Sequence, residues 1–200
     1  GRDGKRRILG VSVALSEAEQ HWRLFFESLV ERGLHGVQLI ISDDHHGLRK
    51  ARQAVFTGIP WQRCQFHLQQ NAGQYVPRKY MQAEVAADIR AVFNAPDRSQ
   101  AQQYLHHLVE KYAHTASDLA EWMEVSIPEG LTLYDFPESH RGRIRTSNLL
   151  ERLSQEVKRR TRVIRIFPNE ASCLRLVSAI LMEVSEEWET GRLYLNFNSC

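Results

Sequence analysis

Cysteine is scarce in this sequence, and several motifs that define large protein classes are missing from it. The three cysteines, Cys64, Cys173 and Cys200, are odd in number, which argues against a disulfide framework and favours a reducing compartment. No apolar run approaches the roughly 18 residues that span a bilayer, and no apolar signal core follows the basic N-terminus. Glycine-rich phosphate loops and serine or cysteine nucleophile motifs are lacking too. We therefore expect a cytoplasmic protein without a membrane partner.

The composition is that of a globular protein. The chain has 200 residues, of which 42% are hydrophobic and 25% are charged, and such values predict one or two domains with a sizeable core. Because the chain opens on Gly1 rather than methionine, we expect a fragment of a longer protein.

Positive charge is concentrated in one segment. Residues 141–165 hold nine basic side chains against two acidic ones, a local charge of +7, so the other residues of this +2 chain sum to −5. Such a block indicates a surface that faces a polyanion. A merely solvated helix face is the alternative, and the scarcity of interleaved acids weighs against it.

The first third of the chain alternates between strand and helix patterns. Apolar, β-rich runs predict strands over residues 8–15, 37–42 and 61–67. Apolar residues at helical spacing predict helices over residues 17–32, ended by Gly33, and 46–56. This alternation predicts an α/β unit with neighbouring parallel strands.

Helical patterns dominate the rest of the chain. They predict helices over residues 81–93, 99–113, 116–125, 147–162 and 171–188, whereas residues 128–145 read as a polar loop. Thr146 or Ser147 is placed to cap the helix of residues 147–162. Three of the tryptophans, Trp22, Trp122 and Trp188, occupy apolar helical positions and are expected in the core, while Trp61 is left unassigned.

Two acids are candidates for chemistry. Asp43 ends an apolar strand, at the edge of an α/β sheet where sites are usually built, although a helix cap or loop acid is the favoured interpretation from strand-end position alone. Of the two neighbouring acids, Asp44 is expected to cap the following helix because it lies nearer to it. Glu151 lies in the first turn of a helix, where the helix dipole is the plain explanation. Cationic residues follow on its face, however, so Glu151 could bind a metal while its neighbours hold phosphates.

Cys64 and His67 form a C-x-x-H pair. One pair is too little for a structural zinc site, and neither His45, His46 nor His140 completes a zinc spacing. A packed cysteine beside a hydrogen-bonded histidine is the favoured interpretation from spacing alone.

Four long strings resemble the catalytic core of the Mutator-type bacterial insertion-sequence transposases. They are "LIISDDHHGLRKA", "WQRCQFHLQQN", "RTSNLLERLSQEVKRRTRVIRIFPN" and "CLRLVSAILMEVSEEW". They occur in the family's order, and the resemblance runs over nearly the whole chain. It implies an α/β, ribonuclease H-like core, incomplete here because the first strands are missing, with an all-α helical insertion. Residues 1–67 would be the first part of the core, 68–140 the insertion, and 141–200 the C-terminal core helices.

The resemblance also assigns roles to residues. It makes Asp43 and Glu151 two catalytic, metal-binding carboxylates of a DDE transposase, with Mg²⁺ or Mn²⁺ as the cofactor. Cys64 and His67 match a signature beside the active site. The family's first catalytic aspartate lies before the turn that opens this chain; Asp3 occupies the turn and is not assigned that role. We expect the chain alone to be inactive.

The implied function is metal-dependent DNA cleavage and strand transfer during transposition of an insertion sequence. The partners would be the transposon ends and target DNA, bound by a homodimer in the bacterial cytoplasm at the nucleoid. The expected DNA contacts are basic residues of one helix: Arg152, Lys158, Arg159, Arg160 and Arg162. The alternative is a catalytically inactive DNA-binding or regulatory transposase remnant.

Overall fold

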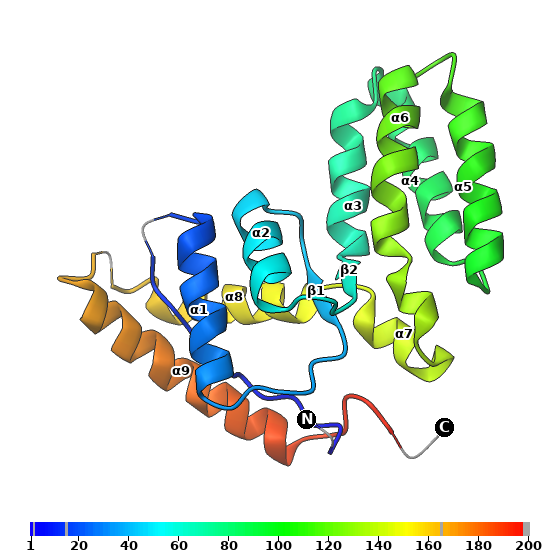
Figure 1. Cartoon of the computed structure of the whole chain (residues 1–200). Coiled ribbons are helices and arrows are strands. Elements are labelled where there is room, and N and C mark those ends of the chain that lie inside the picture. The colour runs from blue at the N-terminus through cyan, green and yellow to red at the C-terminus, as the bar shows by residue number, and fades with distance from the viewer. Residues whose placement is uncertain (2, 15, 165, 198–200) are drawn as a thin grey trace. The chain divides into compact units, whose positions relative to one another are not determined.

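The computed structural model describes residues 1, 3–14, 16–164 and 166–197 (Figure 1). Leu15, in the first expected strand, and Arg165, in the basic segment, lie outside the described residues, as does Cys200. The helices and strands, in chain order, are α1 (Glu19–Glu31), β1 (Ile40–Ser42), α2 (His46–Val55), β2 (Trp61–Arg63), α3 (Gln65–Ala72), α4 (Gln82–Phe93), α5 (Arg98–Tyr112), α6 (Ser117–Ser126), α7 (Glu138–Ile144), α8 (Asn148–Thr161) and α9 (Glu170–Thr190). Short 3₁₀ helices cover Gly73–Tyr75, Lys79–Met81, Ile127–Gly130 and Thr132–Asp135.

The two strands form a parallel pair. Ile40 lies opposite Trp61, and Ser42 lies opposite Arg63. The connection between the strands runs through α2, so this part of the chain has the expected strand–helix–strand order. Whether a ribonuclease H-like core surrounds this pair stays a prediction, as does the three-part division at residues 67 and 140.

The chain divides into two compact units. The first consists of residues 1–38, 44–59 and 148–200, and the second of residues 39–43 and 60–147. The first unit therefore holds α1, α2, α8 and α9, while the second holds both strands and α3–α7. None of the described helices is both long and apolar enough to cross a membrane.

The second unit contains a continuous hydrophobic core. Its members come mainly from α3–α6 and include Leu68, Ile89 and Leu119, all 0% exposed. Trp122 packs against this core and stacks on Tyr75, with ring centroids 5.3 Å apart. The helical periodicity read from the sequence thus identified the apolar faces that meet here.

The first unit is held by smaller contacts. Phe26 of α1 meets Phe56, which follows α2, with ring centroids 5.2 Å apart. Gly47 lets the first turn of α2 approach the segment before α1, since a Cβ there would overlap the backbone of Glu17 and Ala18. Arg160 of α8 forms an ion pair with Glu183 of α9 at 2.7 Å.

The expected end of the first helix is confirmed. The N–H of Gly33 donates to Val30 O at 2.9 Å, and that of Leu34 donates to Leu29 O at 3.0 Å. This paired closure needs a left-handed residue after the helix, and Gly33 has φ of +95°. The other predicted helices also form, with ends shifted by a few residues.

The strand expected over residues 8–15 does not form in the described part, residues 8–14. Exposed and half-buried residues alternate on either side of residues 10 and 11, but both of these are half-buried, so the segment does not keep one covered face. Their polar contacts go to helices instead: Ile8 N–H donates to Ser185 Oγ, and Arg32 donates to Leu9 O. A strand is defined by its ladder, and the described residues supply this segment with no neighbouring strand.

The strand expected over residues 61–67 is too long. It ends at Arg63, and Gln65–Ala72 is helical, with Cys64 at its N-cap. The apolar pattern could not separate a short strand from the helix that follows directly. The strand of residues 37–42 is likewise shortened, to Ile40–Ser42.

Residues 128–145 are not the expected loop, because they contain two short 3₁₀ helices and α7. Their backbone is anchored by side chains that the sequence pattern did not single out. Gln62 and Gln65, which are 0% and 3% exposed, both donate to Gly130 O at 2.8 Å. Leu133 N–H donates to Gln62 Oε1 at 2.7 Å. A polar stretch can order when buried amides satisfy its backbone groups.

The cap expected from Asp44 is also wrong. The N-cap of α2 is His45, with no side-chain capping bond. The Asp44 carboxylate accepts instead from Arg49 Nε at 2.7 Å.

Candidate functional site

Asp43 and Cys64 follow neighbouring strands at the same edge of the sheet. Ser42 ends β1 opposite Arg63, which ends β2, so the next residue on each strand is Asp43 or Cys64. The N–H of Cys64 donates to Ser42 O at 2.7 Å, which continues the ladder by one bond. Asp43 is exposed. The exposed carboxylate therefore stands at the carboxyl edge of a parallel sheet, where α/β proteins usually bind ligands.

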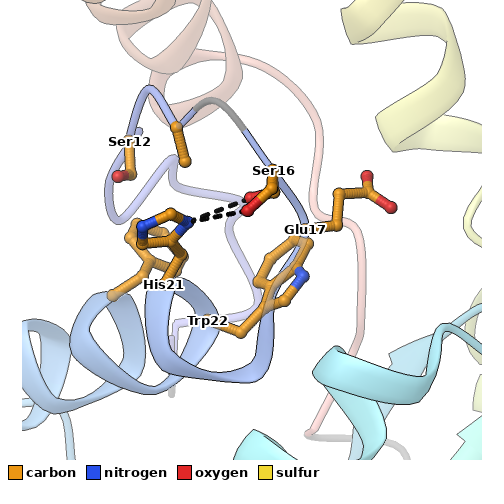
Figure 2. A pocket seen from close by; sticks show the side chains of 7 residues that line it. Ser12, Ser16, Glu17, His21 and Trp22 are labelled. Atoms are coloured by element: carbon orange, nitrogen blue, oxygen red, sulfur yellow. Dashed lines mark hydrogen bonds between the residues drawn. The ribbon is translucent and has the colours of Figure 1, made fainter.

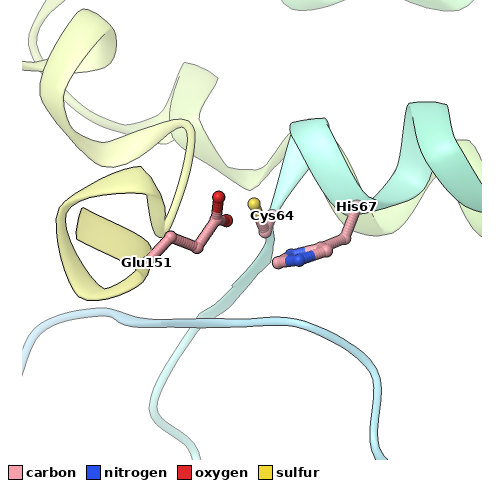
Figure 3. Close-up of side chains that lie close together, drawn as sticks. All are labelled: Cys64, His67 and Glu151. Atoms are coloured by element: carbon pink, nitrogen blue, oxygen red, sulfur yellow. The ribbon is translucent and has the colours of Figure 1, made fainter. Parts of the chain in front are cut away.

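Cys64 and His67 are brought together by the first turn of α3 (Figure 3). Cys64 Sγ and a ring nitrogen of His67 lie within 4.8 Å of each other. The thiol is free and 0% exposed, and it accepts a hydrogen bond from Ser147 N–H at 3.3 Å. The favoured interpretation of Cys64 as a packed cysteine agrees with this burial.

Hydrogen bonds hold the residues before α8 against the start of α3. Gln65 N–H donates to Arg145 O at 3.0 Å, and Arg145 Nε donates back to Gln65 Oε1 at 2.8 Å. Together with the bond from Ser147 to Cys64, this pairing fixes residues 145–147 beside the strand edge. All of these residues belong to the second unit.

Glu151 lies on α8, which belongs to the first unit. It is half-buried and follows Ser147 by four residues, about one helical turn. The role of Glu151 and its pairing with Asp43 stay predictions.

The expected DNA contacts on α8 fall into two groups. Arg152, Lys158 and Arg162 are exposed, and none of them forms an ion pair with another described residue. Arg159 and Arg160, by contrast, bind Glu156 at 2.7 and 2.6 Å. The helix itself ends at Thr161, so Arg162 lies just beyond it.

The acids near these arginines compensate more of the positive charge than the count of acids in the sequence suggested. Hydrogen bonds from Arg159 and Arg160 lower the pKa of Glu156 to about 2. Glu183, which comes from α9, is paired with Arg160, and its pKa is lowered by that bond. The sequence spacing could show the i,i+4 pair of Glu156 and Arg160 but not the contact between two helices. Part of the positive charge is thus compensated within the first unit.

A separate hollow of about 470 Å³ lies beside α1 (Figure 2). His21 Nδ1 lies 3.1 Å from Ser16 O at its wall. Trp22 lines the hollow and is half-buried rather than fully enclosed. None of the predicted site residues lines this hollow, which is bordered by Ser12, Ala14, Ser16, Glu17, His21, Trp22 and Phe25.

Comparison with known proteins gives a consistent result. A family model described as "Transposase, Mutator family" matches residues 1–191. The transposase for insertion sequence element IS406 of Burkholderia multivorans is 58% identical over 195 residues, which cover 98% of this chain and 50% of that protein. The transposase for ISRM5 of Rhizobium meliloti is 38% identical, with 98% and 49% covered. The transposase for IS256 in transposon Tn4001 of Staphylococcus aureus is 37% identical, with 98% and 51% covered. The chain spans about half the length of these curated relatives.

Proposed function

This chain belongs to the Mutator family of transposases, and from that premise we propose that it supplies Asp43 and Glu151 to an active site that cleaves DNA and transfers the cut strand. The observation that carries the proposal is the exposed Asp43 carboxylate at the carboxyl edge of a parallel sheet. Metal-assisted phosphoryl transfer needs ligands for its ions that a duplex can reach, and the carboxyl edge of a parallel sheet is where α/β proteins usually bind ligands.

Chain connectivity supports the pairing of the two acids. The Ser147 N–H donates a hydrogen bond to the thiol of Cys64, which follows β2 directly. Glu151 lies only four residues beyond Ser147, so the covalent chain keeps it within about 15 Å of that residue. We propose that α8 carries Glu151 to the edge that holds Asp43, within a ribonuclease H-like core.

The donor chemistry of these residues fits Mg²⁺ or Mn²⁺. Both are hard cations that prefer carboxylate oxygens, which Asp43 and Glu151 offer. A buried thiol such as that of Cys64 does not suit them. When bound, the ions activate the attacking oxygen and stabilise the leaving oxygen of the phosphodiester. Cys64 and His67 would shape the start of α3 beside the site rather than bind the metal.

DNA would be held by the exposed cations of α8 and its end. Lys158 and Arg162 are spaced i,i+4, and Arg162 N–H donates to Lys158 O at 3.0 Å, so both side chains extend from one face. Such contacts to phosphates give affinity that depends on salt and little on sequence. Since Arg159 and Arg160 already have carboxylate partners, we expect them to contribute less to DNA binding than Lys158 and Arg162.

The test uses a full-length member of the family with the residue equivalent to Glu151 changed to glutamine. We expect strand cleavage of a transposon-end duplex to fall to background, while the dissociation constant for the same duplex stays unchanged. The residue equivalent to Glu170, in the first turn of α9, provides the control, and its glutamine variant should cleave normally. Normal cleavage by the Glu151→Gln variant would refute the catalytic assignment. DNA binding without cleavage by the unmodified full-length protein would favour the non-catalytic alternative.

A further inference from the structure

A second hollow, of about 250 Å³, lies within the second unit between the end of α4 and α7. Arg141 of α7 and Arg145, the C-cap residue that follows this helix, line it. We propose that these two arginines form a subsite for a phosphate of the DNA backbone, separate from the cations of α8. The proposal rests on the DNA-binding function proposed above.

The helix places both guanidinium groups on one side. Arg145 follows α7 directly and keeps a right-handed helical backbone, with φ of −79° and ψ of −23°. It is four residues from Arg141, so the two side chains project from the same face. Gly142 also lines the hollow, and a Cβ added there would meet no atom within 4 Å. The backbone between the arginines is thus open, which allows a tetrahedral anion to approach closely.

Neutral groups hold both side chains in place. Arg141 donates to Phe136 O at 3.0 Å, and to Pro96 O and Tyr134 O at 3.3 Å. Arg145 donates to Gln65 Oε1 at 2.8 Å, Asn94 Oδ1 at 2.9 Å and Phe93 O at 3.2 Å. These bonds fix the orientation of the guanidinium groups without using a carboxylate partner.

N–H groups remain for a ligand. A guanidinium has five N–H groups, so three bonds leave about two on each arginine. The Nη1 group of Arg145 takes part in none of its three bonds. Neither arginine forms an ion pair with a carboxylate of the described residues, in contrast to Arg159 and Arg160 on α8. Glu138 is the acidic residue in the lining, so the lining carries a net charge of +1 from two arginines and one glutamate.

A phosphate group is the ligand that this arrangement fits. Two oriented guanidinium groups match the oxygens of a phosphate, which accepts paired hydrogen bonds from arginine. DNA is the source to which we commit, because the curated relatives are transposases and Arg141 and Arg145 belong to the most basic segment of the chain.

The experiment measures how the affinity of the 200-residue chain for a fluorescent DNA duplex of arbitrary sequence depends on salt. Each phosphate contact contributes about 0.9 to the slope of log affinity against log salt. We expect Arg141→Gln to reduce the slope by about one, with Arg141→Lys retaining most of it. Arg90→Gln is the matched control, since Arg90 is exposed on α4 of the same unit and lies outside the lining. Its slope should stay at the wild-type value.

A second variant removes a negative charge from the lining and keeps Arg141, whose hydrogen bonds hold backbone oxygens. Glu138→Gln raises the net charge of the lining, and we expect it to strengthen DNA binding about two- to fivefold at low salt. Glu124→Gln, an exposed change on α6, should strengthen binding less. Thermal unfolding of each variant shows whether it is folded, and the Glu138 arm decides the question if Arg141→Gln does not fold.

The outcomes separate the subsite from the proposed function. If the unmodified chain shows no salt-dependent affinity for DNA, the DNA-binding function fails, and the subsite with it. If Lys158→Gln lowers the slope while the Arg141 and Glu138 variants match their controls, only the subsite is overturned. If inorganic phosphate binds and Arg141→Gln removes that binding without changing the DNA slope, the site takes a free anion, and the assignment to DNA is wrong.

Discussion

At the scale of single residues, partner groups decide what each ionisable or polar side chain does. Glu156 is a clear case, because two neighbouring arginines take up its charge. Cys64 is another, because its environment rather than its motif makes it a buried acceptor. The sequence spacing could predict the arginine partners of Glu156 on its own helix, but it could not predict that Ser147 bonds to Cys64.

The Glu156 pairing predicts a dependence of stability on acid. The bonds from Arg159 and Arg160 lower the pKa of Glu156 from 4.5 to about 2 in the folded chain. A lowered pKa adds stability at pH values above 4.5, and this contribution is lost as the pH falls from 4.5 towards 2. Thermal midpoints measured across this range should therefore fall more steeply for the wild type than for Glu156→Gln. Glu186→Gln, an exposed change on α9, should fall as the wild type does, and equal slopes for all three proteins would contradict the prediction.

Burial predicts how the cysteines react. The Cys64 thiol is 0% exposed and Cys173 is half-buried, so a thiol-alkylating reagent should modify Cys173 in the folded chain and leave Cys64 largely intact. Peptide mapping by mass spectrometry checks this, with labelling in denaturant as the control that both thiols can react. Rapid labelling of Cys64 in the native chain would show that the start of α3 opens readily.

At the scale of elements, the second unit combines helix packing with buried hydrogen bonds. Tyr112 at the end of α5 is 2% exposed, and its hydroxyl donates to Asp88 of α4 at 2.6 Å. Lys111 bonds the same carboxylate at 2.6 Å. The Asp88 carboxylate of α4 thus holds the C-terminal end of α5 through these two hydrogen bonds.

The Tyr112→Phe variant tests the hydrogen bond between the Tyr112 hydroxyl and Asp88. Removing the hydroxyl should cost about 0.5–1.5 kcal/mol of unfolding free energy at neutral pH, measured by urea denaturation. Burial raises the pKa of Tyr112 from 10 to about 12, so its contribution is complete below pH 10 and lost as the pH rises to 12. The wild type should therefore lose more stability than Tyr112→Phe over this range. Lys111, whose pKa is also raised, loses its own contribution in both proteins, so a difference between them reports Tyr112.

Two residues of α6 give a matched test of the core. Leu119 is 0% exposed and Val125 is 70% exposed on the same helix. Leu119→Ala should cost about 2–5 kcal/mol of unfolding free energy, because it removes buried methyl groups and leaves a cavity. Val125→Ala should change the free energy by about 0.5 kcal/mol or less. Similar losses for the two variants in chemical denaturation would contradict the helix orientation described above.

At the scale of the whole molecule, the two units differ in how their residues are buried. The hydrophobic core lies in the second unit, whereas α8 of the first unit has no fully buried residue along its described length. The segment expected to carry the catalytic glutamate is therefore less deeply packed than the helices of α3–α6.

Hydrogen exchange should reflect this difference. We expect backbone amides in the middle of α4 and α6 to exchange about tenfold or more slowly than those in the middle of α8, because opening of α8 exposes little apolar surface. Mass spectrometry of peptides from the intact chain measures both in one sample. Equal protection of α8 and α4 would mean that the units unfold as one.

The sequence predicted some residues of the candidate site and missed others. The position of Asp43 after an apolar strand followed from local pattern, and the structure places it at the carboxyl edge of the parallel pair. The burial of Gln62 and Gln65 did not follow, because glutamine has no apolar signature and these side chains bond to residues more than 60 positions away. For the same reason the sequence pattern did not reveal the helices within residues 128–145, where Gly130 O and Leu133 N–H form hydrogen bonds with those amides.

The sequence by itself determined most of the helices, though not α3 and α7, together with the family and the residues proposed for chemistry, because helical periodicity and motif order are local properties of the chain. Only the tertiary structure decided which charges are compensated and which polar groups are buried. Glu183 and Arg160 lie 23 positions apart, and Arg145 and Gln65 lie 80 apart. Such contacts depend on how helices pack, and packing is set by many side chains together. For the same reason the segment over residues 8–14, strand-like in sequence, remains irregular: a strand needs a partner that no local pattern supplies.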